Sequence, residues 1–173
     1  MEENMMRLPT KKIALLAMFA ALSLGIYALE SAVPNPVPIP GIKLGLANII
    51  TLAVLKKYGF RDAALVLLVR ILLSALLFGS LMSLMYSAAG GALCLVGEYI
   101  INRLLSGKAL VITGIFGAIL HNAGQILVAF ILTSVPGVLV YVPYLLVAAV
   151  LTGLFTSLAA HFTLKLLTKL PAD

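Results

Sequence analysis

Several residue types on which soluble proteins rely are scarce in this chain of 173 residues, which has one cysteine and no tryptophan. The single cysteine, Cys94, lies within an apolar run, which excludes a disulfide framework and a cysteine-based metal site. The sequence also lacks a glycine-rich phosphate loop ending in Lys-Ser or Lys-Thr. The chain therefore does not bind and hydrolyse ATP through such a loop.

Acidic residues are scarce too, and Asp62 and Asp173 are the only aspartates. Chemistry on a magnesium-bound diphosphate usually needs clustered carboxylates to hold the metal ion. The sequence has no such cluster and no evident Ser-His-Asp or Cys-His arrangement. We therefore expect no catalysis by this chain alone, and no bound cofactor or metal ion.

Charged residues make up 10% of the chain, whereas hydrophobic residues make up 62%. A soluble domain of this length could not bury that much apolar surface. Several runs reach the roughly 20 apolar residues needed to cross a bilayer. We predict an all-α integral membrane protein, with residues 1–173 forming a single transmembrane domain. The expected bundle has six spans, at about residues 13–29, 42–55, 63–85, 88–105, 109–133 and 142–167.

The positive charges predict the orientation of these spans. The net charge is +6, but the basic residues lie between apolar spans rather than in a stripe, which argues against nucleic-acid binding. The connections on one side of the predicted membrane hold one basic residue, Lys43, or none. The termini and connections on the other side carry ten basic residues. This difference predicts cytoplasmic N- and C-termini in a multi-pass protein of the cell membrane. These ten are Arg7, Lys11, Lys12, Lys56, Lys57, Arg61, Arg103, Lys108, Lys165 and Lys169.

In the absence of tryptophan, tyrosines are expected to anchor the chain at the membrane interfaces. Four of them are predicted to lie near the outer face: Tyr27, Tyr86, Tyr141 and Tyr144.

A proline-rich stretch forms the predicted outer connection between the first two spans, with Pro34, Pro36, Pro38 and Pro40 at every second position. Each proline fixes φ and favours an extended conformation in the residue before it, so the stretch should be a stiff strap. The second span is short for a bilayer of about 30 Å, so its outer end should lie below the membrane surface. Non-helical backbone at that depth is tolerated against protein or beside a wet cavity.

A short helix that starts beside such a cavity can hold an anionic group at its free N–H groups. Lys43 would add a positive charge there, and Asn48 an amide. The alternative is a rigid outer loop in which Lys43 extends its side chain to water.

Polar side chains at membrane depth are costly and are therefore candidates for function. Arg70 and Glu98 lie within consecutive spans, where they either form an ion pair or, in the case of Glu98, face the cavity. His121, Asn122 and Gln125 share one face of the fifth span. They form either a ligand-binding face or a set of interhelical hydrogen bonds. We expect His161 to be structural.

Small residues repeat every four positions in the first span, at Ala17, Ala21 and Gly25. Such a stripe lets another helix approach closely. Similar rows occur in the third span (Gly79, Ser83, Ser87) and the sixth (Ala149, Gly153, Ser157).

The segment PIPGIKLGLAN, residues 38–48, resembles the hallmark of a bacterial membrane family called both the Gx transporter family and heptaprenyl diphosphate synthase component I. The resemblance covers nearly the whole chain. The family's plan is similar to that of the S-components of energy-coupling factor (ECF) vitamin transporters. These are six-helix substrate-capture proteins with cytoplasmic termini.

This resemblance implies roles for two segments of the chain. The proline strap with Gly41 would gate the substrate pocket. Ala17, Ala21 and Gly25 would dock on a transmembrane coupling subunit that is linked to two ATPases.

The expected function is therefore the capture of a small, anionic molecule from the outer side. The substrate-binding residues would be Lys43, Asn48, Glu98, His121, Asn122 and Gln125. The alternative is a non-catalytic membrane subunit that works with a prenyl diphosphate synthase, as the second family name implies, or with flavin- and quinone-linked redox systems.

Overall fold

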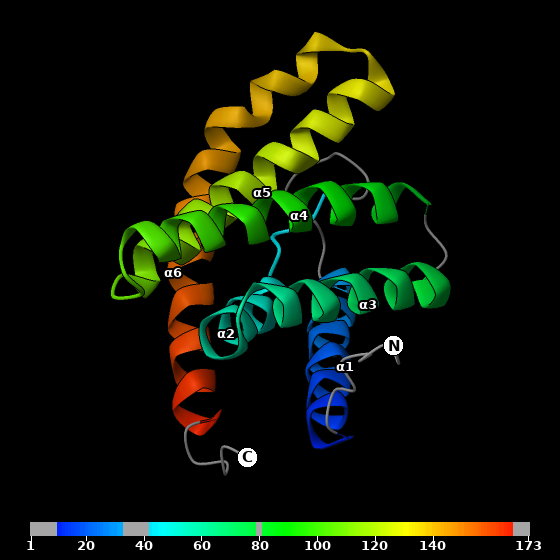
Figure 1. Cartoon of the computed structure of the whole chain (residues 1–173). Helices are drawn as coiled ribbons and strands as arrows, with labels where there is room; N and C mark the ends of the chain where they lie inside the picture. Colours follow the sequence, from blue (N-terminus) through cyan, green and yellow to red (C-terminus); the bar gives the residue numbers. More distant parts are fainter. Residues whose placement is uncertain (1–9, 33–41, 79–80, 168–173) are drawn as a thin grey trace, which may run out of the picture.

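A computed structural model describes residues 10–32, 42–78 and 81–167 of the chain, and within these ranges the secondary structure is entirely helical. Six α-helices and one short 3-10 helix follow one another along the chain (Figure 1). Their bounds are α1 Thr10–Ala32, α2 Asn48–Tyr58, α3 Phe60–Phe78, α4 Leu81–Leu104, α5 Leu110–Thr133, η1 Pro136–Tyr141 and α6 Val142–Leu167.

Among the described residues, four segments are long and apolar enough to cross a membrane: α1, α4, α5 and the continuous stretch Pro136–Leu167. The protein is therefore a multi-pass membrane protein. The α-helices of the described residues follow the order of the predicted spans, but α2 and α3 are not among these four segments, so six spans remain a prediction. α2 has 11 residues, or about 16 Å of helix. α3 carries Arg61, Asp62 and Arg70 among its 19 residues.

Three predicted boundaries are wrong: the start of the second span, the end of the third, and the start of the fourth, which was predicted at about residue 88. The second helix begins at Asn48 rather than near residue 42, because residues 42–45 have no regular secondary structure and residues 46–47 form a turn. The third predicted span ran to residue 85, whereas α3 ends at Phe78 and α4 begins at Leu81. Leu81, Met82 and Met85 are as apolar as the end of α3, so hydropathy does not indicate where α3 ends and α4 begins.

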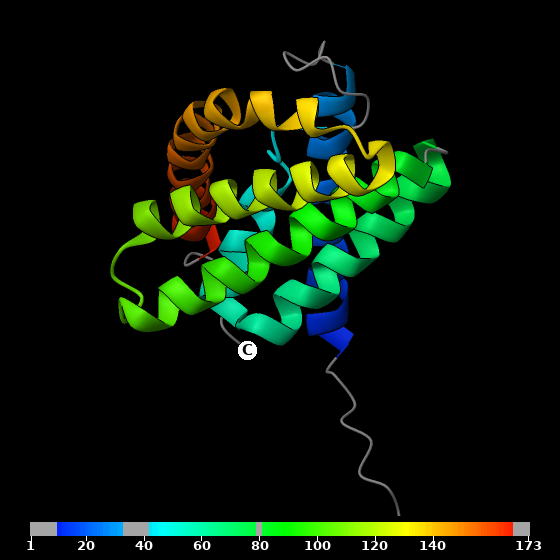
Figure 2. The same ribbon diagram turned by 90° about the horizontal axis from the view of Figure 1, so that it is seen from above.

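α2 is the central helix of the bundle. It packs against α1, α3, α4 and α6, and every residue from 48 to 55 is buried. Figure 1 shows it between α1 on one side and α6 on the other. α3, α4 and α5 run alongside one another, and α1 packs across α3, as the view from above shows (Figure 2). The shortest helix therefore has the most neighbours, and its N-terminal end lies inside the protein.

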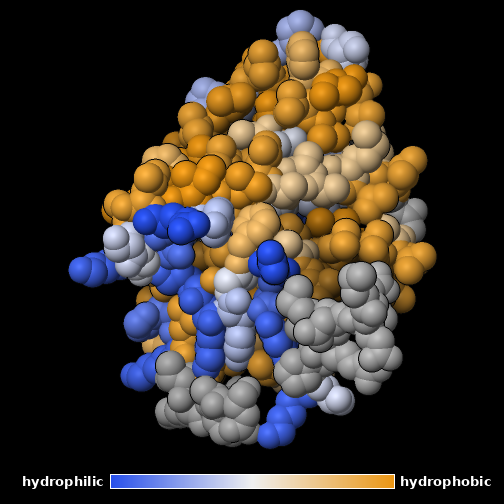
Figure 3. All heavy atoms as spheres, in the orientation of Figure 1, coloured by the Kyte–Doolittle hydropathy of each residue, from blue (hydrophilic) through white to orange (hydrophobic). Residues whose placement is uncertain are grey.

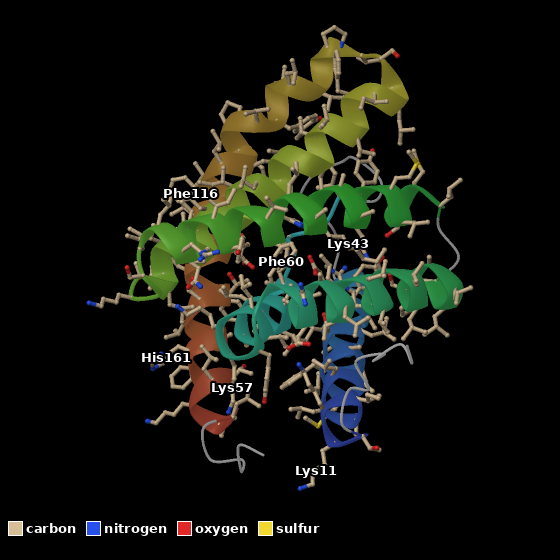
Figure 4. All side chains as sticks on the ribbon, in the orientation of Figure 1. Lys11, Lys43, Lys57, Phe60, Phe116 and His161 are labelled. Carbon is tan, nitrogen blue, oxygen red and sulfur yellow. The ribbon has the colours of Figure 1, made fainter. Side chains whose placement is uncertain are left out.

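Hydrophobic side chains cover most of the visible surface of the molecule, whereas hydrophilic side chains gather in the lower part of the view in Figure 3. Two lysines at the end of α2 form hydrogen bonds with residues that are distant in the sequence. Lys56 Nζ donates hydrogen bonds to Asn102 Oδ1 (2.8 Å) and to the carbonyl oxygen of Gly107 (2.5 Å). Lys57 donates to the carbonyl oxygen of Leu167. Lys11 and Lys57, two of the residues predicted for the cytoplasmic side, lie in the same lower part of the view, where Figure 4 labels them.

Candidate functional site

A small polar recess lies in the interior, where five helices meet the non-helical segment that precedes α2. Its volume is about 10 Å³, room for about one water molecule. Figure 4 shows Lys43 in this region, between the ribbons of α3 and α4. We use the name polar recess for the space lined by Tyr27, Glu30, Lys43, Gly45, Ala47, Asn48, Arg70, Ser87, His121 and Gln125.

The backbone before α2 is held in place by a carboxylate from α1. Glu30 Oε1 accepts a hydrogen bond from Gly45 N (2.7 Å), and Oε2 accepts one from Leu46 N (3.1 Å). Gly45 has φ +84°, which an L side chain rarely adopts. The N–H groups at the entrance to α2, which the sequence suggested for a ligand anion, are therefore already occupied by an internal anion.

Both polar atoms of the Gln125 side chain form hydrogen bonds with the backbone of Lys43. Gln125 Oε1 accepts from Lys43 N (2.9 Å), and Gln125 Nε2 donates to Lys43 O (3.0 Å). These bonds fix which way the amide points. They also attach the non-helical segment directly to α5.

Two cations face the same aromatic ring in the polar recess. Lys43 Nζ lies 3.3 Å from the centroid of the Tyr27 ring, and Arg70 Cζ lies 5.8 Å from it. Lys43 also donates a hydrogen bond to Ser31 Oγ. Arg70 is 2% exposed, and its guanidinium makes one long hydrogen bond, from Nη2 to Asn48 Oδ1 (3.4 Å). Its Nε atom is buried with no partner. A buried guanidinium with so few acceptors is costly.

Two side-chain amide groups lie against the ring of His121 in the polar recess. Gln125 Nε2 lies 2.5 Å from His121 Nε2, and Asn48 Nδ2 lies 3.2 Å from His121 Nδ1. A neutral imidazole accepts at only one nitrogen. Gln125 is oriented by Lys43, and Asn48 Oδ1 already accepts from Arg70. The two cations and the buried Arg70 Nε, which has no partner, make this a site suited to an acceptor-rich, anionic group.

A second small space adjoins the polar recess, with Gly45 and Asn48 in the linings of both. It also has a volume of about 10 Å³, and we call it the Glu98 chamber. Its lining consists of Leu44, Gly45, Asn48, Cys94, Glu98, Gly114, Ala118 and Thr156.

Glu98 does not form the ion pair with Arg70 that the sequence left open. Glu98 Oε1 accepts a hydrogen bond from Cys94 Sγ (3.4 Å), and Oε2 is buried with no partner. Gly117 makes room for this side chain, because a Cβ at that position would lie 2.6 Å from Glu98 Cγ. The two charged residues instead line the two adjoining spaces.

The structure brings four of the six predicted substrate-binding residues to the polar recess: Lys43, Asn48, His121 and Gln125. Glu98 lines the neighbouring chamber. Asn122 lies elsewhere, because its Nδ2 donates to the carbonyl oxygen of Leu145 (2.9 Å) in α6. It therefore makes an interhelical hydrogen bond, the alternative considered for this face of α5. His161 is exposed beside Phe162.

Asn122 also lines a larger, almost wholly apolar groove between α5, η1 and α6, with a volume of about 360 Å³. We call it the α5–α6 groove. Its other lining residues are Ile119, Ala123, Ile126, Leu127, Phe130, Leu139, Val142, Leu145 and Leu146.

Ala17, Ala21 and Gly25 are all exposed on α1. A Cβ built at Gly25 would meet no atom within 4 Å. The predicted gating residues Pro34, Pro36, Pro38, Pro40 and Gly41 lie outside the described residues.

Sequence reasoning missed the polar recess residues Glu30, Tyr27 and Ser87, and it did not place Arg70 among the substrate-binding residues. Tyr27 was expected at the membrane interface, but it is 3% exposed and its hydroxyl lies 2.5 Å from Ser83 Oγ. Tyr86, assigned to the same interface, is also buried, at 1% exposed. Glu30 could have been found by the rule that singled out Glu98, because it is a carboxylate at the end of an apolar span.

No set of three or more His, Cys, Asp or Glu side chains that could hold a metal ion occurs among the described residues.

Comparison with known proteins places this site in a known fold. None of the curated proteins matches the chain. A solved structure described as "Structure and mechanism of the S component of a bacterial ECF transporter" is similar to it, with a TM-score of 0.69 and 21% sequence identity. The similarity covers 92% of this chain and 96% of that one.

At this level of identity the likeness shows that the two proteins share a fold. The sequence profile of heptaprenyl diphosphate synthase component I matches residues 19–163, which is most of the chain. This protein therefore belongs to the heptaprenyl diphosphate synthase component I family, also called the Gx transporter family.

Proposed function

We propose that this protein captures a small anionic molecule from the outer side of the cell membrane and passes it to a separate transport module. The observation that carries the proposal is Arg70, a guanidinium that is 2% exposed with an unpartnered Nε and one long hydrogen bond. Charged groups inside a membrane protein are costly and face functional sites. A carboxylate or phosphate in the polar recess would supply the missing acceptors.

The charges of the recess agree with an anionic ligand. Lys43 and Arg70 contribute two positive charges, and Glu30 contributes one negative charge that is engaged by two backbone N–H groups. One positive charge is therefore left over. Lys43 Nζ lies over Tyr27 at the edge of this space, so we expect its side chain to swing aside as the ligand enters and then to bind the ligand.

A module that couples transport to ATP hydrolysis would have to be made of other chains, since this one has no phosphate loop. The S-component fold and the exposed stripe of Ala17, Ala21 and Gly25 support docking on such a module through α1. Small exposed residues in a row let a partner helix pack closely in a membrane.

Native mass spectrometry of the protein purified in mild detergent tests the capture role. We expect the wild type to retain a small anionic molecule, and Lys43→Ala to retain at least about tenfold less, because hydrogen bonds to charged groups contribute strongly to binding. Lys108→Ala, which removes an exposed lysine between α4 and α5, is the matched control. Equal retention by wild type and Lys43→Ala, or a neutral retained molecule, would rule the proposal out.

Co-purification tests the docking role. Replacing Ala17 and Ala21 together by leucine should abolish recovery of a coupling subunit and ATPases with this chain. Ala88→Leu makes one replacement of the same kind at an exposed position of α4 and should leave the association intact. Retained association of the α1 variant would remove this face from the proposal.

A second candidate function is a membrane subunit that works with a soluble prenyl diphosphate synthase. The description of the family and the apolar α5–α6 groove of about 360 Å³, which a prenyl chain could occupy, both favour it. The same co-purification separates the two candidates. Recovery of a soluble synthase in place of ATPases would support the second.

A further inference from the structure

Glu98 is a buried carboxylate with half of its hydrogen-bonding capacity unused. It is 2% exposed, and Oε2 has no partner. Oε1 accepts only from the thiol of Cys94, which is a weak donor. An ionised carboxylate in such a place is costly unless a positive charge lies beside it. The arrangement therefore calls for a cation that the described side chains do not supply.

The two internal cations nearest to this region are engaged in the polar recess. Arg70 donates to Asn48, and Lys43 lies over Tyr27 and donates to Ser31. Neither lines the Glu98 chamber. The polar recess thus holds an excess of one positive charge, and the chamber beside it holds one negative charge.

The lining of the Glu98 chamber has the composition of a site for a hard cation. This lining includes Glu98, Thr156, whose hydroxyl donates to the carbonyl oxygen of Gly153 and can still accept, and the non-helical residues Leu44 and Gly45. Carboxylates, hydroxyls and unwound backbone are the groups that hold small cations within membrane bundles. The chamber has one carboxylate, which balances the charge of a monovalent cation but not that of a divalent cation.

We propose that the Glu98 chamber binds one compact monovalent cation. The volume of about 10 Å³ suits an occupant the size of a water molecule. The positive charge could come from a free alkali-metal ion or from an ammonium group carried by the captured molecule. The first source is independent of the function proposed above, whereas the second rests on it.

Because Gly45 and Asn48 belong to both spaces, an occupant of one affects the other. A cation at Glu98 and an anion at Arg70 would lie on opposite sides of the same short segment. Each would neutralise its own space, so we expect each to favour the binding of the other.

Thermal unfolding of the purified protein in detergent tests this proposal. The probes are sodium, potassium and methylammonium chlorides, compared with choline chloride at the same concentration. Choline is too bulky for the chamber, and the constant chloride keeps any anion effect equal. We expect a compact cation to raise the unfolding midpoint by about 2–4 °C at roughly fivefold its dissociation constant.

Variants of the lining make the test specific. Glu98→Gln should lose the response to the cation. Thr156→Val should weaken it at least about threefold, because one neutral ligand is lost. Asp62→Asn removes a carboxylate that pairs with Lys12 (2.8 Å) far along α3 from Arg70, and it should respond like the wild type.

The probes also distinguish the two sources of charge. A response to sodium or potassium assigns an alkali-metal site, and a response to methylammonium alone assigns the ammonium group of a ligand. Equal midpoints in all four salts would overturn the proposal, as would a Glu98→Gln variant that responds like the wild type. A midpoint that depends on pH through Glu98 but on none of the cations would overturn it in favour of a proton.

Discussion

Gly45 is the position in the polar recess where the chain comes closest to a neighbouring side chain. Its φ is +84°, and a Cβ built there would lie 2.7 Å from His121 Cδ2. His121 in turn contacts Asn48 and Gln125, so it has little room to move. The conformation of the segment before α2 therefore depends on the absence of a side chain at this residue.

Gly45→Ala should destabilise the protein by about 1–3 kcal/mol, because it combines backbone strain with a steric clash. Gly25→Ala is the matched control. Gly25 lies within α1, and an added Cβ there meets nothing within 4 Å. This variant should be more stable than the wild type by about 0.5–1 kcal/mol, since alanine is the better helix former.

Thermal or denaturant unfolding in detergent measures both variants. Equal stability of Gly45→Ala and the wild type would mean that His121 moves freely away from Gly45, which contradicts the packed network described above.

At the scale of single residues, the sequence predicted the polar side chains that lie deep within spans. His121 and Gln125 were found because polarity is costly inside a membrane, whereas Lys43 and Asn48 were found from the short second span and its predicted helix start. Asn122 was grouped with His121 and Gln125 because sequence spacing alone does not show that residues within one helical turn face different neighbours. Glu30 and Tyr27 were missed because they lie near a predicted membrane surface, where polar groups are unremarkable. Their burial follows from the inward path of residues 42–47.

Among the elements, α2 is distinguished by the way its N-terminal end is held. Glu30 accepts hydrogen bonds from Gly45 N and Leu46 N, which immediately precede the helix. A negative charge at this end also interacts favourably with the helix dipole. The start of α2 is therefore fixed from a different helix, α1.

Glu30→Gln should destabilise the protein by about 1–3 kcal/mol, since an amide keeps one acceptor and turns a donor toward the other N–H. Glu98→Gln is the contrasting variant, because it removes a buried charge that has no charged partner. Measured in choline chloride, it should be at least as stable as the wild type.

Thermal unfolding of the two variants side by side gives the comparison. If Glu98→Gln lost more stability than Glu30→Gln, the assignment of partners to these two carboxylates would be contradicted.

The helices of the described residues follow the order of the predicted spans, but several of the predicted ends are wrong. Hydropathy follows apolar content, and it cannot see a break between two equally apolar segments such as the one that separates α3 from α4. It also read residues 42–47 as the beginning of a helix. What decides against a helix there is tertiary: Glu30 and Gln125, from α1 and α5, bind the backbone groups of this segment.

For the whole molecule, hydrophilic side chains gather toward one end of the bundle, in the lower part of the view in Figure 3. Lys56, Lys57 and Lys165 belong to the last turns of α2 and α6, which are near one another in the fold. The turn between α4 and α5 joins this end through Lys56 and Gly107. The opposite connection, around η1, has no basic residue.

Cysteine labelling tests this orientation. Ser106→Cys places a thiol in the turn between α4 and α5, and Val140→Cys places one in η1, where the side chain is 77% exposed. In intact cells a membrane-impermeant maleimide should label Val140→Cys and leave Ser106→Cys unlabelled until the cells are opened. The native Cys94 is 2% exposed and should give little background. The reverse pattern of labelling would invert the topology.

The two hydrogen bonds between the Gln125 side chain and the Lys43 backbone constrain how the protein can open. Because one amide holds both the N–H and the carbonyl of the same residue, the chain at this point cannot slide along α5 without losing both bonds. An opening motion that moves Lys43 along α5 must therefore break both bonds together.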